Sequence, residues 1–172
     1  MKIYDSEIGE HPFPRSARNL EALATFRGAY AGVEFAEAFQ LLIYPCNEIE
    51  MQYPSATEFG EGFGLTTKSM RWFWDKYLPN LDQQSDPYAV PARATDLKGV
   101  AAAIVIAAQF DPLTDDARLY YQKLVTNSVP AIYKEYGGQI HGFFNLSGVT
   151  EDANLLYSDI AFEINAILGR GK

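Results

Sequence analysis

The chain has 172 residues, 48% of them hydrophobic and 14% aromatic, so it is long and apolar enough for one globular domain with a sizeable core. Its formal net charge of −8 disfavours nucleic acid and anionic membrane surfaces as partners, because both select for basic patches. One cysteine, Cys46, excludes an internal disulfide framework and fits a reducing compartment. No apolar run is long enough for a membrane span, and the first residues lack the apolar core of a signal peptide. We therefore expect a cytoplasmic protein.

The first quarter of the chain has no strong pattern. Residues 1–19 are polar and interrupted by prolines, which predicts irregular structure. Residues 20–39 have a helical composition, although two glycines weaken it. Residues 40–44 are predicted to form a short buried strand, and Pro45 ends it because proline cannot donate to a strand ladder. Residues 46–65 are rich in glycine and predict a long loop.

A helix is predicted to begin at Thr66 or Thr67, either of which can cap its first turn, and to end before Pro79. Its apolar residues recur every three or four positions, as in a stripe that packs on a core. The stripe consists of Met70, Phe73, Trp74, Tyr77 and Leu78. Residues 79–101 contain three prolines and predict another long connection.

The clearest pattern in the chain is a strand followed by a helix. Residues 103–108 are a continuous apolar run, which is typical of a strand buried on both faces of a parallel sheet. Asp111 and Pro112 are predicted to open the helix, since proline is favoured at the first helical position. Asp115 and Asp116 then lie in the first turn, where the helix dipole favours acidic side chains.

A second strand is predicted at residues 131–136, followed by the glycine-rich segment 137–144, which contains His141. These glycines allow the backbone to turn the histidine inward. In open α/β sheets, ligands bind outside the carboxyl ends of the strands, so Asp111 and His141 fall where a site would be built. We expect the two side chains to lie within hydrogen-bond reach of each other. Residues 150–168 predict a closing amphipathic helix with Leu156, Ile160, Ile164, Ile167 and Leu168 facing inward.

Five segments occur in the order of one known family: residues 40–45 (QLLIYP), 72–78 (WFWDKYL), 86–91 (DPYAVP), 110–116 (FDPLTDD) and 140–144 (IHGFF). Together they resemble the hormone-sensitive-lipase-like branch of the α/β-hydrolases, which includes esterases and lipases. The resemblance covers residues 39–146 and corresponds to roughly the C-terminal half of a full-length member. It implies an α/β fold with a short, mostly parallel sheet flanked by helices. We expect one partial α/β-hydrolase domain over residues 1–172, with an atypical N-terminal segment at residues 1–38.

The resemblance also implies a carboxylic-ester hydrolase that acts on small acyl esters, with no metal and no organic cofactor. In such a site His141 would take a proton from the nucleophile, and Asp111 would orient the imidazole. Two simpler interpretations stay open: His141 as a loop histidine that caps a carbonyl, and Asp111 as a helix cap. Asp115 and Asp116 are weaker candidates for the acid. Two histidines and one cysteine without ligand spacing predict no metal site.

The nucleophile is the missing part of this site. The family carries it in a Gly-x-Ser-x-Gly turn, and no such motif occurs in the 172 residues. The nearest match is Ser16, which has Pro14 and Arg18 where the glycines should stand. A His-Gly-Gly-Gly oxyanion loop does not precede it. We therefore expect a chain that is inactive alone. The alternative is a non-catalytic binding or assembly protein derived from an α/β-hydrolase, which forms homo-oligomers through the exposed edge of the strand at residues 40–44.

Overall fold

The computed structural model describes residues 39–167. Ser16, the expected helix at residues 20–39 and Leu168 lie outside this range. The described residues belong to the second of the two units into which the chain divides, and this unit begins at Phe39. The assignment of residues 1–172 to a single domain stays a prediction.

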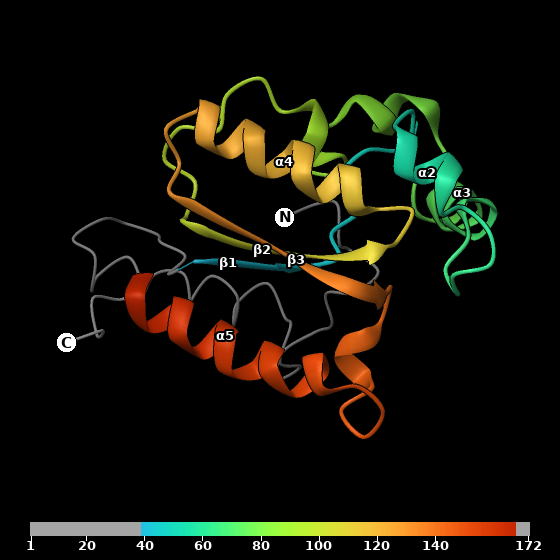
Figure 1. Ribbon diagram of the computed structural model, residues 1–172. Coiled ribbons are helices and arrows are strands. Elements are labelled where there is room, and N and C mark those ends of the chain that lie inside the picture. The colour runs from blue at the N-terminus through green and yellow to red at the C-terminus, as the bar shows by residue number, and fades with distance from the viewer. Residues whose placement is uncertain (1–38, 168–172) are drawn as a thin grey trace, which may run out of the picture. The chain divides into compact units, whose positions relative to one another are not determined.

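A parallel sheet of three strands forms the centre of the second unit. Strand β1 is Gln40–Ile43, β2 is Ala103–Phe110 and β3 is Ala131–Ile140, and their spatial order is β1-β2-β3. The α/β class and the short parallel sheet flanked by helices are thus as predicted (Figure 1). Because β2 is central, its carboxyl end lies between those of β1 and β3.

Helices α4 (Thr114–Thr126) and α5 (Glu151–Ile167) cover opposite faces of the sheet (Figure 1). The alternation of side chains along β2 explains how it serves both helices. One face of β2 packs with α4 through Ala103, Val105, Ala107, Ala117, Tyr120 and Leu124. The other packs with α5 through Ile104, Ile106, Ala108, Ala153, Leu156 and Ile160. The predicted burial of β2 on both faces is confirmed, as is the inward placement of Leu156 and Ile160.

Strand β3 is longer than predicted. The expected strand ended at Tyr136, whereas the observed one continues to Ile140 and includes both glycines at residues 137–138. A register shift near its end, between the pairs of Ala108 and Phe110, accommodates two extra residues on β3. Gly138 has a φ of 76°, which glycine adopts without strain, and its N–H donates to the Gln109 side chain at 2.7 Å. These glycines therefore form an irregularity within the strand and not the turn that carries the histidine.

Helix α3 (Thr67–Tyr77) begins where predicted. The hydroxyl of Thr66 accepts from the backbone N–H of Ser69, and the Ser69 hydroxyl accepts in return from the N–H of Thr66, which makes a capping box. The apolar stripe predicted for α3 is only partly correct. Met70, Trp74 and Leu78 are buried, whereas Phe73 and Tyr77 are exposed. The apolar spacing was thus compatible with a wider stripe than the one that contacts the core.

The segment predicted as a long loop at residues 46–65 contains a short helix, α2 (Pro54–Glu58), preceded by buried Met51 and Tyr53. Short 3-10 helices occur at Leu81–Ser85, Pro91–Arg93 and Phe143–Asn145. Helix α4 begins at Thr114, two residues later than the predicted first position, Pro112, because Asp111 and the two residues after it form a turn. Within residues 39–167, no helix is long and apolar enough to cross a membrane.

Candidate active site

The site lies at the carboxyl ends of the three strands. Tyr44 directly follows β1, Asp111 directly follows β2 and His141 directly follows β3. Parallel strands present these ends at one edge of the sheet, so three residues far apart in the sequence are brought together. The topology alone therefore accounts for their proximity.

Asp111 and His141 are in direct contact. The imidazole Nδ1 lies 2.8 Å from Oδ2 of Asp111, which confirms the predicted contact. The Asp111 side chain is 1% exposed and that of His141 is 30% exposed. A carboxylate can only accept, so the proton of the neutral imidazole resides on Nδ1. Nε2 is then the basic nitrogen, on a side chain that solvent reaches.

The second carboxylate oxygen of Asp111 is also engaged. Oδ1 accepts from the backbone N–H of Leu113 at 2.9 Å. The carboxylate is thus held from both sides, by the turn that follows it and by the imidazole. Asp111 acts as a local turn former and as the partner of His141, whereas the N-cap residue of α4 is Leu113, so the predicted helix-cap role of Asp111 is wrong.

The turn that carries the histidine depends on Gly142. This residue has a φ of 84°, in the left-handed region where glycine is favoured, and it caps the 3-10 helix that follows. The next residue, Phe143, is fully buried in the core on the α5 side. Buried Phe143 and left-handed Gly142 together fix the backbone that presents His141.

Tyr44 is a member of the site that the sequence analysis missed. Its ring centroid lies 4.9 Å from that of His141, and its hydroxyl accepts from the backbone N–H of Phe144 at 2.7 Å. Burial raises the pKa of Tyr44 to about 12, so it stays protonated at neutral pH. Its φ of 50° is unusual for a residue with a side chain. The signal in the sequence was its place directly after a strand, within the segment QLLIYP.

Asp116 bonds to the segment after β1. It is 2% exposed, and it accepts from the backbone N–H of Asn47 at 2.7 Å, from that of Glu48 at 3.1 Å and from the Asn47 side-chain amide at 3.2 Å. Burial raises the pKa of Asp116 to about 6, against the lowering effect of these donors. The helix dipole, which the sequence suggested as its reason, does not account for a side chain this deeply buried.

Neither Asp115 nor Cys46 fits a catalytic role. Asp115 accepts from the backbone N–H of Ser55 and from Arg118, so it is not the acid beside His141. Burial raises the pKa of the Cys46 thiol to about 12, which opposes a role as nucleophile. Among residues 39–167 there is no group of three or more histidine, cysteine or acidic side chains that could hold a metal ion. Ser16 lies outside this range.

A family model described as the alpha/beta hydrolase fold matches residues 19–145. The chain belongs to this family. The α/β-hydrolase is 36% identical over 108 residues to the carboxylic ester hydrolase LipN of Mycobacterium tuberculosis, a match that covers 62% of this chain and 29% of LipN. It is 26% identical over 119 residues to the ethyl acetate hydrolase of Pseudomonas putida, covering 69% of this chain and 37% of that enzyme. These relatives agree with the hormone-sensitive-lipase-like branch that the five segments indicated.

Solved structures give the same result for this α/β-hydrolase. The hyperthermophilic esterase of Pyrobaculum calidifontis is 33% identical and superimposes with a TM-score of 0.71, over 86% of this chain and 48% of that one. An esterase of Rhizomucor miehei is 28% identical with a TM-score of 0.74, over 87% of this chain and 46% of that one. The chain thus spans less than half the length of the relatives that it matches.

Proposed function

We propose that Asp111 and His141 are the acid and the general base of a carboxylic ester hydrolase site. The observation that carries this proposal is the 2.8 Å contact between Nδ1 and a buried carboxylate at the carboxyl edge of the sheet. Relatives named as carboxylic ester and ethyl acetate hydrolases support small acyl esters as the substrate class. The proposed chemistry requires no metal and no organic cofactor, because a serine–histidine–acid site supplies the base and the nucleophile itself.

In the proposed mechanism His141 moves the protons. Its Nε2 takes a proton from the hydroxyl of the nucleophile as that oxygen attacks the ester carbonyl, and returns it to the departing alcohol. Asp111 keeps Nδ1 protonated and stabilises the imidazolium that forms. The bond from Leu113 N–H keeps this carboxylate in place while the charge on the ring changes. A second cycle, with water in place of the serine, releases the acid.

We further propose that the 172-residue chain does not complete this cycle alone. It contains no Gly-x-Ser-x-Gly motif, and the nearest serine, Ser16, has Pro14 and Arg18 in place of the glycines. Proline fixes φ and removes a donor, and arginine adds bulk where the turn must pack tightly. Loss of a single oxyanion donor costs roughly 10²- to 10³-fold in rate, so loss of the whole arrangement leaves little catalysis.

The activity of the chain itself is tested with a short-chain nitrophenyl ester. We expect no turnover above that of a His141→Ala variant. Turnover that disappears in Ser16→Ala would show that Ser16 works as a nucleophile despite its neighbours, and would overturn the proposal of an inactive chain.

The role of the acid–histidine pair is tested in a chimera. Residues 39–172 would replace the matching segment of the Pseudomonas putida ethyl acetate hydrolase, and hydrolysis of ethyl acetate would be measured. We expect activity that falls roughly 10⁴-fold in Asp111→Asn and by at least about as much in His141→Ala. The matched control is Asp75→Asn, an exposed carboxylate on α3. A folded, active chimera that is indifferent to Asp111 and His141 would refute the assignment.

A second function is a binding or assembly protein that retains the pair, in a cytoplasmic setting. The observation in its favour is the free side of β1, which has no partner among the strands that the structure describes. Unpaired strand edges promote association with other chains. A specific, stable oligomer without turnover would support this alternative.

A further inference from the structure

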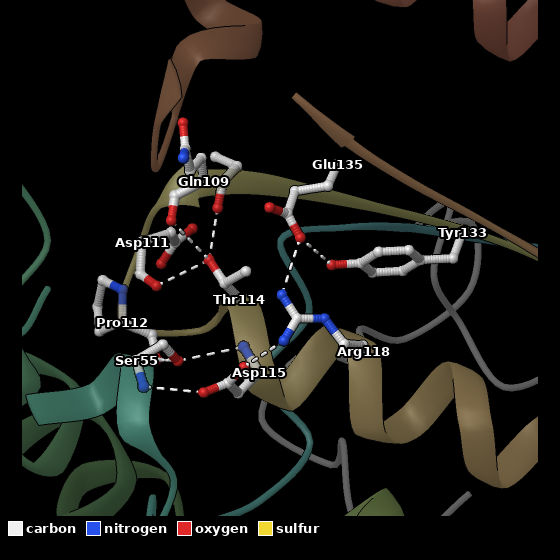
Figure 2. A network of polar contacts seen from close by, with 10 residues as sticks. Ser55, Gln109, Asp111, Pro112, Thr114, Asp115, Arg118, Tyr133 and Glu135 are labelled. Carbon is white, nitrogen blue, oxygen red and sulfur yellow. Dashed lines mark hydrogen bonds and ion pairs between the residues drawn. The ribbon is translucent and has the colours of Figure 1, made fainter. Parts of the chain in front are cut away.

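Ser55, on the short helix α2, contacts the turn that carries Asp111. The side chain is 3% exposed, and its Oγ donates to the carbonyl of Pro112 at 2.9 Å. The same oxygen accepts from the backbone N–H of Asp115 at 3.1 Å, and the Ser55 N–H donates to the Asp115 carboxylate at 2.9 Å. Figure 2 shows these bonds, with α2 on one side and the first turn of α4 on the other. Ser55 and Asp115 thus bind each other reciprocally.

Two other bonds in this turn are local. The Thr114 hydroxyl donates to the carbonyl of Asp111 at 2.9 Å, and Leu113 N–H donates to the Asp111 carboxylate. These partners lie within three residues of each other in the chain. Ser55 is 57 residues away from Pro112. It therefore connects the turn to a different part of the structure, which local sequence cannot do.

Backbone rigidity carries the effect of this bond to Asp111. The Pro112 carbonyl and the Leu113 N–H belong to one planar peptide unit. A displacement of the carbonyl therefore rotates the N–H that donates to Oδ1 of Asp111. The Asp111 carboxylate would move with it, away from Nδ1 of His141.

A second connection runs from the same network to β3. Arg118 bridges the carboxylates of Asp115 and Glu135, and Glu135 also accepts from the Tyr133 hydroxyl (Figure 2). Since His141 directly follows β3, this chain of contacts joins α4 to the strand that precedes the histidine. However, the Arg118 side chain is 43% exposed, and exposed ion pairs contribute little to stability. The buried Ser55 hydroxyl is the stronger of the two connections.

We propose that Ser55 is a positioning residue for the Asp111–His141 pair. Its hydroxyl fixes the Pro112 carbonyl and the first turn of α4, and so keeps the Asp111 carboxylate against Nδ1. The importance of this for hydrolysis rests on the proposed function, whereas the geometric effect does not. The two are therefore tested separately.

The test uses nuclear magnetic resonance of the 172-residue chain, with His11→Gln as the background so that His141 is the one remaining histidine. The readout is the Nδ1–H proton signal of His141 and its exchange with water. In Ser55→Ala we expect the signal to move upfield and its exchange to accelerate about five-fold or more, the factor typical of one lost hydrogen bond. In Ser55→Thr, which keeps the hydroxyl, we expect the wild-type signal.

The matched control is Ser69→Ala, which removes a serine hydroxyl from the capping box of α3 and none of the bonds between α2 and α4. It loses a cap but should leave the His141 signal unchanged. An unchanged signal in Ser55→Ala, or the same change in Ser69→Ala, would overturn the proposal. If Ser55→Ala does not fold, Ser55→Cys is used in its place, because the thiol has a similar volume and is a weaker donor. In this variant the exchange of the His141 Nδ1–H proton with water must accelerate. If the chimera is inactive while Ser55→Ala still changes the His141 signal, the proposed function is refuted and the positioning role of Ser55 is not.

Discussion

Replacing Asp116 by alanine tests how α4 holds the segment after β1. The change removes the acceptor of two donors from Asn47, its backbone N–H and its side-chain amide, and of the N–H of Glu48. Asn47 is buried, so each of its donors costs about 1–3 kcal/mol when left without an acceptor. The Glu48 N–H is only partly buried, and water can replace its lost acceptor. Removal of a carboxylate that burial disfavours offsets part of this loss.

The expected result at pH 7 is a decrease of about 2–4 kcal/mol in the free energy of unfolding. It would be measured by urea denaturation, with the fluorescence of Trp72 and Trp74 as the probe. Asp116→Asn keeps one acceptor oxygen, so its free energy of unfolding should decrease by less than half as much as that of Asp116→Ala. The exposed Asp75→Ala is the control and should stay within about 0.5 kcal/mol of the wild type. A similarly small effect of Asp116→Ala would refute the view that this carboxylate organises the segment.

Three further predictions concern pH, the site and association. The pKa of Asp116 is raised from 3.8 to about 6 in the folded chain, so the stability it contributes is full below pH 3.8 and is lost as the pH rises through 6. Between pH 4 and 7 the difference in unfolding free energy should therefore shift by about 2 kcal/mol in favour of Asp116→Asn over the wild type, and a constant difference would contradict this. Tyr44→Phe leaves the Phe144 N–H without its acceptor and should cost about 1 kcal/mol in urea denaturation, whereas an unchanged midpoint would show that water replaces the hydroxyl. Light scattering at low micromolar concentration should show oligomers or aggregates, because the outer side of β1 is unpaired among the described strands; a monomer of 19.2 kDa with a cooperative melt would disprove this.

Much of the site could be predicted because it follows from sheet topology. The apolar run at residues 103–108 identified a strand buried on both faces, and parallel pairing places the residues after each strand at one edge. Asp111 comes directly after this strand, and His141 comes directly after the neighbouring strand β3. Their contact could therefore be expected from positions in the sequence, without any knowledge of side-chain packing.

The remaining features could not be predicted because they depend on backbone donors from distant segments. The backbone N–H groups that donate to Asp115 and Asp116 lie 60 to 69 residues away in the chain. Every residue except proline has such a donor, so the sequence does not show which one is used. The same holds for Ser55, whose partner is the carbonyl of Pro112. Extension of β3 through Gly138 was missed for a different reason. Two glycines usually indicate a turn, and only the register shift shows that the strand continues.

The neighbouring residues Asp115 and Asp116 show why the acid–histidine geometry persists in a chain without a recognisable nucleophile motif. Asp115 binds α2 and Asp116 binds the segment after β1, so the first turn of α4 is held by two separate parts of the chain. That turn directly follows Asp111. The bonds that hold the Asp111–His141 contact come from residues 44–144, within the sheet and the elements that pack on it. The geometry of the pair is therefore a property of this scaffold, and its use in hydrolysis is a separate question that the chimera addresses.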